Sequence, residues 1–400
     1  MLKPSLLAAL LSTAFSAGAC SAQSQPQSQP QPSASAATPA ATGTAGARPF
    51  TVTPVADFDA PWAMTFLPDG RMLVTEKKGD MLLVSADGQQ RQTVATIRVD
   101  SAGQGGLMDV VLAPDFATSN RVYFSYSAAC ETGGGKRVVL ARGRLRPAVD
   151  QTGTARGERL GEIEALFRAD PCVDGDGHYS GRIAFAPDGK TLFFTNGDRQ
   201  KFTPAQDKAA TLGKVLRLTL DGQPAPGNPL AARGFNPAVW SYGHRNLLGI
   251  AFDASGNLWE QEMGPKGGDE VNLIRAGANY GWPNASNGDH YDGRPIPDHA
   301  PGDGYEAPKT SWNPVISPGG LMIYRGGMFP QWKGDAFIGG LSSQSLVRVD
   351  LNGTTAAKGD QFAMGARIRD VDQSSDGAIW LLEDGARGSQ GRLLKLTPAR

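Results

Sequence analysis

A pair of β-rich runs joined by a short turn recurs along most of this 400-residue chain, and this repeat limits the fold more than any other feature. In the clearest copies the turn contains Asp-Gly, as in MTFLPDGRMLVTE and RIAFAPDGKTLFFTNGD. The six copies begin at Met64, Asp109, Arg182, Gly249, Leu321 and Asp370. The copy that starts at Leu321 is the weakest and has a Gly-Gly turn. One hairpin cannot cover its own faces, so the copies must pack on one another.

Short strands in units of about 40 to 50 residues are typical of the radial blades of a propeller. Helical periodicity is scarcely visible, and the Asp-Gly pairs at 69–70, 188–189 and 376–377 suit tight hairpin turns. The sequence therefore predicts an all-β fold, a six-bladed β-propeller with four-stranded antiparallel blades. The last run, GRLLKLTP from Gly391, is expected to pair with FTVTPV from Phe50, complete the first blade and close the ring.

The amino-terminal segment has the pattern of an export signal. Lys3 precedes an apolar stretch from Leu6 to Phe15, and small residues follow up to Cys20. We expect a signal peptide at 1–19, with two processing outcomes: cleavage after Ala19, or lipidation of Cys20. Residues 20–48 are rich in Ser, Gln, Pro and Ala and predict a disordered linker, followed by a catalytic propeller domain at 49–400.

Composition limits the partners of the protein. Lys plus Arg and Asp plus Glu both number 39, and no long run of like charge occurs, so nucleic acid is not an expected partner. The apolar stretch near the start is shorter than the roughly 20 residues of a membrane span, so no transmembrane helix is expected. Export predicts a periplasmic or cell-envelope protein, or an outer-membrane lipoprotein if Cys20 carries lipid.

Two further cysteines, Cys130 and Cys172, lie in Gly-rich, loop-like surroundings. Exported proteins fold in an oxidising compartment, where thiols tend to pair. We therefore expect a Cys130–Cys172 disulfide, with two free thiols as the alternative.

Function in a propeller resides in the loops around one mouth of the channel, so segments that depart from simple alternation are the candidates. In DGDGHYSGRIAF, His178 stands just before a predicted inner strand, and Asp198 in TNGDR ends the strand that pairs with it. A carboxylate beside an imidazole fixes its tautomer and raises its basicity. The alternatives are a structural histidine and a turn aspartate.

Other candidates also flank blade hairpins. Arg245 and Asn246 in YGHRN suit a planar anionic ligand, and Arg367 and Arg369 alternate in ARIRDV, so both guanidinium groups are expected on one strand face that lacks a carboxylate. The remaining candidates are Gln104, which lies in a glycine turn, and the backbone carbonyls of Gly264 and Pro265, which could bind calcium.

Taken together, the motifs GQGGL, HYSGR, NGDR, YGHRN, EMGPKGGDEVNLI, ANYGWP and RIRDV resemble the soluble quinoprotein aldose sugar dehydrogenases of the glucose/sorbosone dehydrogenase family. The resemblance covers about residues 50 to 398. It implies a six-bladed propeller that binds pyrroloquinoline quinone (PQQ) and calcium, oxidises the C1 hydroxyl of aldose sugars to lactones by hydride transfer to PQQ, and passes electrons to an acceptor that the sequence does not identify.

The resemblance also implies a role for each candidate. His178 would be the general base, Asp198 would orient it, and Arg245 would stabilise charge on the reduced quinone. The cofactor would be held by Gln104, Arg245, Asn246, Arg367 and Arg369. Carbonyl oxygens of Gly264 and Pro265 would bind the calcium at the cofactor, and Glu270 and Tyr280 match a second calcium site.

Two positions depart from the family pattern. Ser342 stands where members often carry a cofactor-binding lysine, so this chain lacks one cation that the resemblance implies for PQQ, and Gly177 replaces a polar residue before the histidine. Two rival functions remain open. One is a calcium-dependent propeller lactonase, which would need acidic and amide side chains around a metal in the channel. The other is a non-catalytic propeller that binds sugar or protein.

Overall fold

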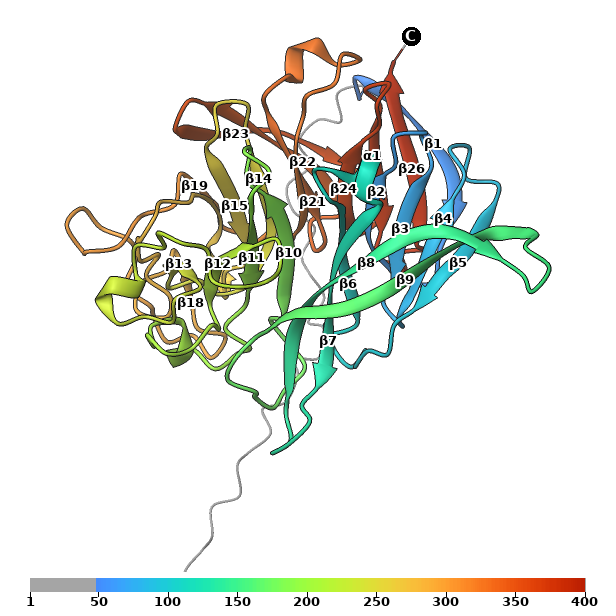
Figure 1. Ribbon diagram of the computed structural model, residues 1–400. Coiled ribbons are helices and arrows are strands. Elements are labelled where there is room, and N and C mark those ends of the chain that lie inside the picture. Colours follow the sequence, from blue (N-terminus) through green and yellow to red (C-terminus); the bar gives the residue numbers. More distant parts are fainter. Residues whose placement is uncertain (1–47, 400) are drawn as a thin grey trace, which may run out of the picture. The chain divides into compact units, whose positions relative to one another are not determined.

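Six four-stranded antiparallel sheets dominate residues 48–399, which are the residues that the computed structural model describes (Figure 1). The predicted signal peptide, Cys20 and nearly all of the predicted linker lie outside the described residues. The six-bladed, all-β prediction is confirmed.

The blades follow the chain in order. Blade 1 contains β2 (Pro61–Phe66), β3 (Met72–Glu76), β4 (Asp80–Val84) and β5 (Arg91–Thr96). Blade 2 contains β6 (Leu107–Leu112), β7 (Arg121–Ala129), β8 (Lys136–Val149) and β9 (Ala155–Arg168). Blade 3 contains β10 (Ser180–Phe185), β11 (Thr191–Asn196), β12 (Lys214–Thr219) and β13 (Val239–Tyr242).

The second half of the chain repeats the pattern. Blade 4 contains β14 (Leu247–Phe252), β15 (Leu258–Glu262), β17 (Asp269–Leu273) and β19 (Thr310–Trp312). Blade 5 contains β20 (Pro318–Ile323), β21 (Ala336–Gly340), β22 (Ser345–Asn352) and β23 (Thr355–Ala363). Blade 6 contains β24 (Ile368–Gln373), β25 (Ile379–Glu383), β26 (Arg392–Pro398) and β1 (Phe50–Asp57).

The first strand of each blade lines the central channel. β2, β6, β10, β14, β20 and β24 each contact the next, and β24 contacts β2, so these strands form a closed ring. Each hairpin recognised in the sequence consists of the two innermost strands of one blade. The glycine of each Asp-Gly pair has a positive φ, 87° at Gly70, 68° at Gly189 and 88° at Gly377, as tight turns require.

The ring closes through β1, which pairs antiparallel with β26 from Phe50 opposite Pro398 to Asp57 opposite Arg392. The predicted pairing of these two segments is therefore present. Its assignment to the first blade was wrong, because β26 is bonded to β25, so both segments belong to blade 6.

Blade packing explains why inner strands are buried on both faces. In β3, the neighbouring residues Leu73 and Val74 point to opposite sides of the sheet. Leu73 packs in an apolar cluster with Tyr123 of blade 2, and Val74 packs in another with Leu382 of blade 6. Each blade thus contributes one face to each neighbour.

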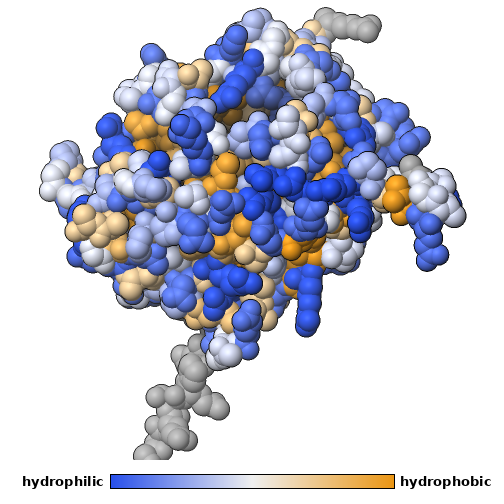
Figure 2. Space-filling model, in the orientation of Figure 1, coloured by the Kyte–Doolittle hydropathy of each residue, from blue (hydrophilic) through white to orange (hydrophobic). Residues whose placement is uncertain are grey.

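The remaining elements are short. They are the helix α1 (Phe116–Ser119), the 3-10 helices η1 (Thr203–Ala205), η2 (Ala231–Arg233) and η3 (Pro330–Trp332), and the pair β16 (Lys266–Gly267) and β18 (Gly288–Asp289). Within residues 48–399 no helix is long and apolar enough to cross a membrane. The face seen in Figure 2 is mostly hydrophilic, with scattered apolar residues.

Candidate active site

The imidazole of His178 and the carboxylate of Asp198 meet across the inner hairpin of blade 3. His178 lies just before β10 and Asp198 just after β11, and the register pairs Ser180 with Asn196 between them. Nδ1 of His178 is 2.7 Å from Oδ1 of Asp198, and both side chains are buried. His178 has a positive φ of 49°, a costly conformation for a residue with a side chain, and such conformations cluster at functional sites.

Asp198 is fixed by further hydrogen bonds. Oδ1 accepts one from the Gln200 backbone N–H at 2.8 Å, and Oδ2 accepts one from the indole Nε1 of Trp282 at 2.8 Å. The Asp198 N–H donates to the carbonyl of Arg245 at 2.8 Å, which ties blade 3 to the start of blade 4. The carboxylate therefore presents a defined oxygen to His178.

Burial sets the protonation of this pair. Burial is the largest influence on His178 and lowers its pKa, and the nearby charge of Arg245 lowers it further, against the opposing effect of Asp198. Burial alone would raise the pKa of Asp198, but His178 and Arg245 outweigh it and the pKa is lowered. With Nδ1 bonded to a carboxylate, the neutral imidazole keeps its proton on Nδ1 and offers Nε2 as a base.

Arg245 reaches across the same mouth. Its Nη1 donates to the carbonyl oxygens of Met263 at 2.9 Å and Gly264 at 2.6 Å, and Nη2 donates to the Tyr291 hydroxyl at 3.3 Å. Its buried Nε has no partner among the described residues. The guanidinium carbon lies 5.2 Å from the ring centre of Trp282. Tyr291 is 69% exposed, so the guanidinium is covered by an aromatic ring that faces solvent.

The next two candidates lie close to His178. The Asn246 side chain accepts a hydrogen bond from Ser180 Oγ at 3.3 Å, and its Nδ2 is 3.6 Å from the Met263 sulfur. Gln104 lies in the connection between blades 1 and 2, where its Oε1 accepts the backbone N–H of His178 at 2.8 Å. Gln104 therefore positions the histidine loop in this structure.

Arg367 immediately precedes β24 and Arg369 is its second residue, so both lie at the entry to the sixth blade as predicted, but the expected lack of a carboxylate there was wrong. Asp384, which follows β25, accepts Arg367 Nε at 2.6 Å and lies 3.6 Å from Arg369 Nη2. Burial lowers the pKa of Arg369 to about 10. The sequence hid this contact because a strand pairing, and not proximity in the chain, brings Asp384 to the arginines.

The predicted calcium carbonyls lie beside Arg245. Gly264 and Pro265 follow β15, and the Gly264 oxygen is the one that accepts Arg245 Nη1. Asp269 holds this turn, since its Oδ1 accepts the Gly264 N–H at 2.9 Å. The carbonyl of Gly264 is thus directed to the same mouth as His178.

Glu270 and Tyr280 line one small cavity of about 10 Å³ together with Glu262 and Arg245. The hydroxyl of Tyr280 is already engaged, because it donates to the carbonyl of Leu273 at 2.6 Å. Tyr280 could therefore bind a cation in this cavity only through its backbone oxygen.

Glu270, which the sequence analysis named, has two buried acidic neighbours, Glu260 and Glu262, that sequence reasoning missed. In the sheet Glu262 is paired with Glu270, and Glu260 with Asn272. Burial and the neighbouring Glu262 raise the pKa of both Glu260 and Glu270 well above the ordinary value, and burial raises that of Glu262 to about 7. His244, Glu260 and Glu262 also offer ligand atoms within 4.8 Å of one another. The alternation of Glu260 and Glu262 was the signal, since residues two apart share a strand face.

Cys130 and Cys172 are joined by a disulfide, with a Cα–Cα distance of 6.5 Å, as predicted. The bond connects the end of blade 2's second strand to the segment that leads to His178. Ser342 lies in the turn between β21 and β22, where its Oγ is 3.5 Å from the carbonyl of Val315.

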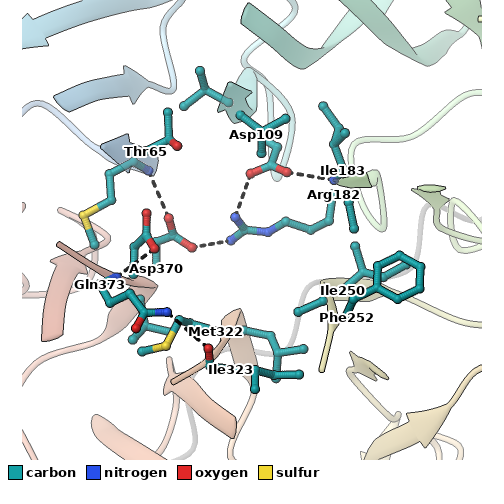
Figure 3. Close-up of a pocket in the computed structure, with 18 of the residues that line it drawn as sticks. Thr65, Asp109, Arg182, Ile183, Ile250, Phe252, Met322, Ile323, Asp370 and Gln373 are labelled. Carbon is teal, nitrogen blue, oxygen red and sulfur yellow. Dashed lines mark hydrogen bonds and ion pairs between the residues drawn. The ribbon is translucent and has the colours of Figure 1, made fainter. Parts of the chain in front are cut away.

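Deeper in the channel, Arg182 forms a crossbar that the sequence did not suggest. Its guanidinium lies between Asp109 of blade 2, at 2.9 Å, and Asp370 of blade 6, at 3.0 Å (Figure 3). Nε donates to the carbonyl of Leu248 in blade 4 at 2.9 Å, and the group stacks 4.1 Å from the Trp62 ring of blade 1. A cavity of about 330 Å³ next to this crossbar is lined by all six inner strands.

The fold and site define a class: six-bladed propellers with a histidine–carboxylate pair and clustered arginines at one mouth of the channel. The sequence model of the Glucose / Sorbosone dehydrogenase family matches residues 58–395. The chain belongs to this family.

One sequence relative and two solved structures illustrate the similarity. The aldose sugar dehydrogenase YliI of Escherichia coli is 37% identical over 350 residues, which cover 85% of this chain and 90% of that protein. The crystal structure of the soluble E. coli aldose sugar dehydrogenase in its apo form has a TM-score of 0.78 at 35% identity, and the match covers 88% of this chain and all of that one. The PQQ-bound aldose sugar dehydrogenase of Streptomyces coelicolor has a TM-score of 0.71 at 32% identity, with 87% and 98% covered.

Proposed function

We propose that the protein oxidises the C1 hydroxyl of aldose sugars to a lactone, with PQQ as the two-electron acceptor and His178 as the general base. The observation that carries the proposal is the 2.7 Å contact between His178 and Asp198 at a mouth that also holds Arg245. Membership of the family and the PQQ-bound relative support this class of reaction.

The donor set at the mouth fits an anionic, planar cofactor. Arg245 has a buried Nε with no partner among residues 48–399, and Arg367 and Arg369 share one carboxylate. Guanidinium groups bind carboxylates through paired, charge-assisted hydrogen bonds. PQQ carries three carboxylates, which would be held by Arg245, Arg367 and Arg369, with the amides of Gln104 and Asn246 beside them.

Loss of a proton and a hydride converts the C1 hydroxyl into the lactone carbonyl. The chemistry that bound PQQ would supply is that of a two-electron acceptor for this hydride. His178 Nε2 takes the hydroxyl proton, because Nδ1 is committed to Asp198. Asp198 stabilises the imidazolium that forms, and Trp282 keeps its carboxylate in place. Arg245 contributes a fixed positive charge where negative charge develops.

Calcium would be held in two places. The carbonyl oxygens of Gly264 and Pro265 would bind the ion at the cofactor, where a divalent cation polarises a bound oxygen. Glu270 and the backbone oxygen of Tyr280 would bind the second ion, and the buried Glu262 beside Glu270 supports a need for positive charge there.

We also propose export to the periplasm or cell envelope, with an aldose as substrate and a separate electron acceptor. The support is the signal-like sequence before Cys20, which lies outside the described residues, and the Cys130–Cys172 disulfide, since such bonds are typical of oxidising compartments. Mass spectrometry of the mature amino terminus tests both export and lipidation of Cys20.

Reconstitution tests the function. The apo-protein is mixed with PQQ and calcium, and a panel of aldoses is assayed with an artificial electron acceptor. We expect PQQ-dependent oxidation of at least one sugar. No activity across the panel would refute the proposal. Hydrolysis of lactones without PQQ would support the lactonase alternative, and sugar binding without turnover would support the non-catalytic one.

The variant His178→Ala tests the base. We expect turnover to fall by at least about 100-fold while PQQ still binds, because a positioned base contributes roughly 10²- to 10⁴-fold. Tyr179→Phe is the matched control next to it, since it removes only a hydroxyl that bonds to the carbonyl of Gly175. Full kcat in His178→Ala would show that the base lies elsewhere.

A further inference from the structure

Several positively charged side chains gather near the carboxylate of Asp384 at this mouth. Arg367 and Arg369 both contact Oδ2 of this one carboxylate, through Nε at 2.6 Å and Nη2 at 3.6 Å, respectively. A third cation, Lys77, stands near them in the turn between β3 and β4. Burial lowers the pKa of Lys77, and the charge of Arg369 lowers it further, whereas Asp384 has the opposite effect. Three cations therefore influence one another near Asp384, and Asp370, which pairs with Arg182, is the other carboxylate that acts on Arg369.

Lys77 lies near two groups already assigned to the cofactor. Its Nζ donates to the carbonyl of Gly103 at 2.5 Å, next to Gln104, and its own carbonyl accepts the N–H of Leu107 at 3.1 Å. Arg369 of blade 6 is close enough for its charge to lower the pKa of Lys77. The turn thus places an ammonium next to the loop of Gln104 and within the electrostatic reach of Arg369.

The adjacent Lys78 has a different environment. Its side chain is 72% exposed and pairs at 2.6 Å with Asp59, which is itself 63% exposed. Only Lys77 is partly buried and directed to the Gly103 carbonyl, which is neutral and cannot cancel its charge. Unbalanced charge that is partly removed from water is costly, and a bound anion offsets that cost.

We propose that Lys77 binds PQQ, its ammonium pairing with a cofactor carboxylate beside Arg367 and Arg369. This inference rests on the proposed function. It also explains how the mouth holds an anion although the β21–β22 turn, whose Leu341 carbonyl contacts Arg367 at 3.3 Å, offers the uncharged Ser342.

Direct binding of PQQ to the calcium-loaded apo-protein, measured by calorimetry, tests the proposal without reference to turnover. We expect Lys77→Met to raise the Kd for PQQ by about 10- to 100-fold, the usual effect of losing a hydrogen bond to a charged group. Lys78→Met should leave Kd within about twofold, since an exposed ion pair contributes little. Lys77→Arg, which keeps the charge, should stay within about fivefold of the wild type.

Each outcome decides the proposal. Equal Kd values for Lys77→Met and Lys78→Met, with normal wild-type binding, would overturn the role of Lys77 and leave the proposed function intact. A wild-type protein that does not bind PQQ would overturn both. If circular dichroism shows that Lys77→Met is unfolded, Lys77→Gln takes its place. The salt dependence of PQQ binding gives a second readout, because we expect it to be weaker in either variant than in the wild type.

Discussion

The indole Nε1 of Trp282 donates a 2.8 Å hydrogen bond to Oδ2 of Asp198, the carboxylate whose other oxygen contacts His178 at 2.7 Å. The same indole stacks on Phe202, with ring centres 5.5 Å apart, and lies under the Arg245 guanidinium. Phe202 is 41% exposed and has a positive φ of 63°. One ring of blade 4 therefore connects the base, its partner carboxylate and the arginine.

Replacing Trp282 with Phe keeps the ring stack and removes the N–H. Oδ2 of Asp198 then loses its donor, and a hydrogen bond to a charged group is worth roughly 1.5–3 kcal/mol. We expect kcat of the reconstituted enzyme to fall by about 10-fold or more, while calorimetric PQQ affinity changes little. Trp240→Phe is the control, since Trp240 packs on Phe193 in blade 3. An unchanged kcat would show that this bond is not needed.

The acid limb of the pH profile reports on His178. The active form has a neutral imidazole, so kcat/KM rises with pH through the His178 pKa. Burial and Arg245 lower that pKa, so we expect the midpoint of the acid limb to lie below 6.5, the ordinary pKa of histidine. Asp198 raises the pKa, so Asp198→Asn should move the limb to still lower pH and reduce the plateau. A limb above 6.5 in the wild type would contradict this assignment.

The Arg182 crossbar should matter for stability. Arg182→Met leaves the buried Asp109 and Asp370 without their shared partner, and breaking a buried ion pair on one side costs about 3–5 kcal/mol. We expect a decrease of that order in the free energy of unfolding, measured with urea. The triple variant with Asp109→Asn and Asp370→Asn should recover part of the loss. Equal stability of Arg182→Met and wild type would refute the crossbar's role.

Removing calcium should destabilise the fold through the buried acids. Glu262 faces Glu270 across a strand pair, and a cation would relieve their repulsion. We expect chelation to lower Tm and added calcium to restore it, with a gain of about 2.7 kcal/mol at 100 times Kd. The Glu262→Gln, Glu270→Gln double variant should lose this response, whereas the exposed control Glu164→Gln should keep it. A calcium-independent Tm in the wild type would argue against the site.

The sequence revealed the elements whose signals are local. Asp-Gly turns and alternating runs located the inner hairpins, and the motif around His178 with the strand end at Asp198 predicted a pair that the register brings together. Contacts between distant segments escaped detection. Trp282 is 84 residues from Asp198, and Asp384 reaches the arginines only through the pairing of β24 with β25. The proximity of the acids in β15 and β17 depends on how these two strands pair, and the composition of the sequence does not give that register.

Because β1 pairs with β26, the ring has no terminal blade that packs on only one neighbour. In a linear repeat array the end units have one neighbour and fray first, but here the strand at Phe50 completes a blade whose other strands lie more than 300 residues later. Opening any one blade uncovers apolar faces on two others. Partial unfolding is therefore penalised everywhere around the circle, and a ribosome-bound chain cannot complete this blade until its last strands have been synthesised.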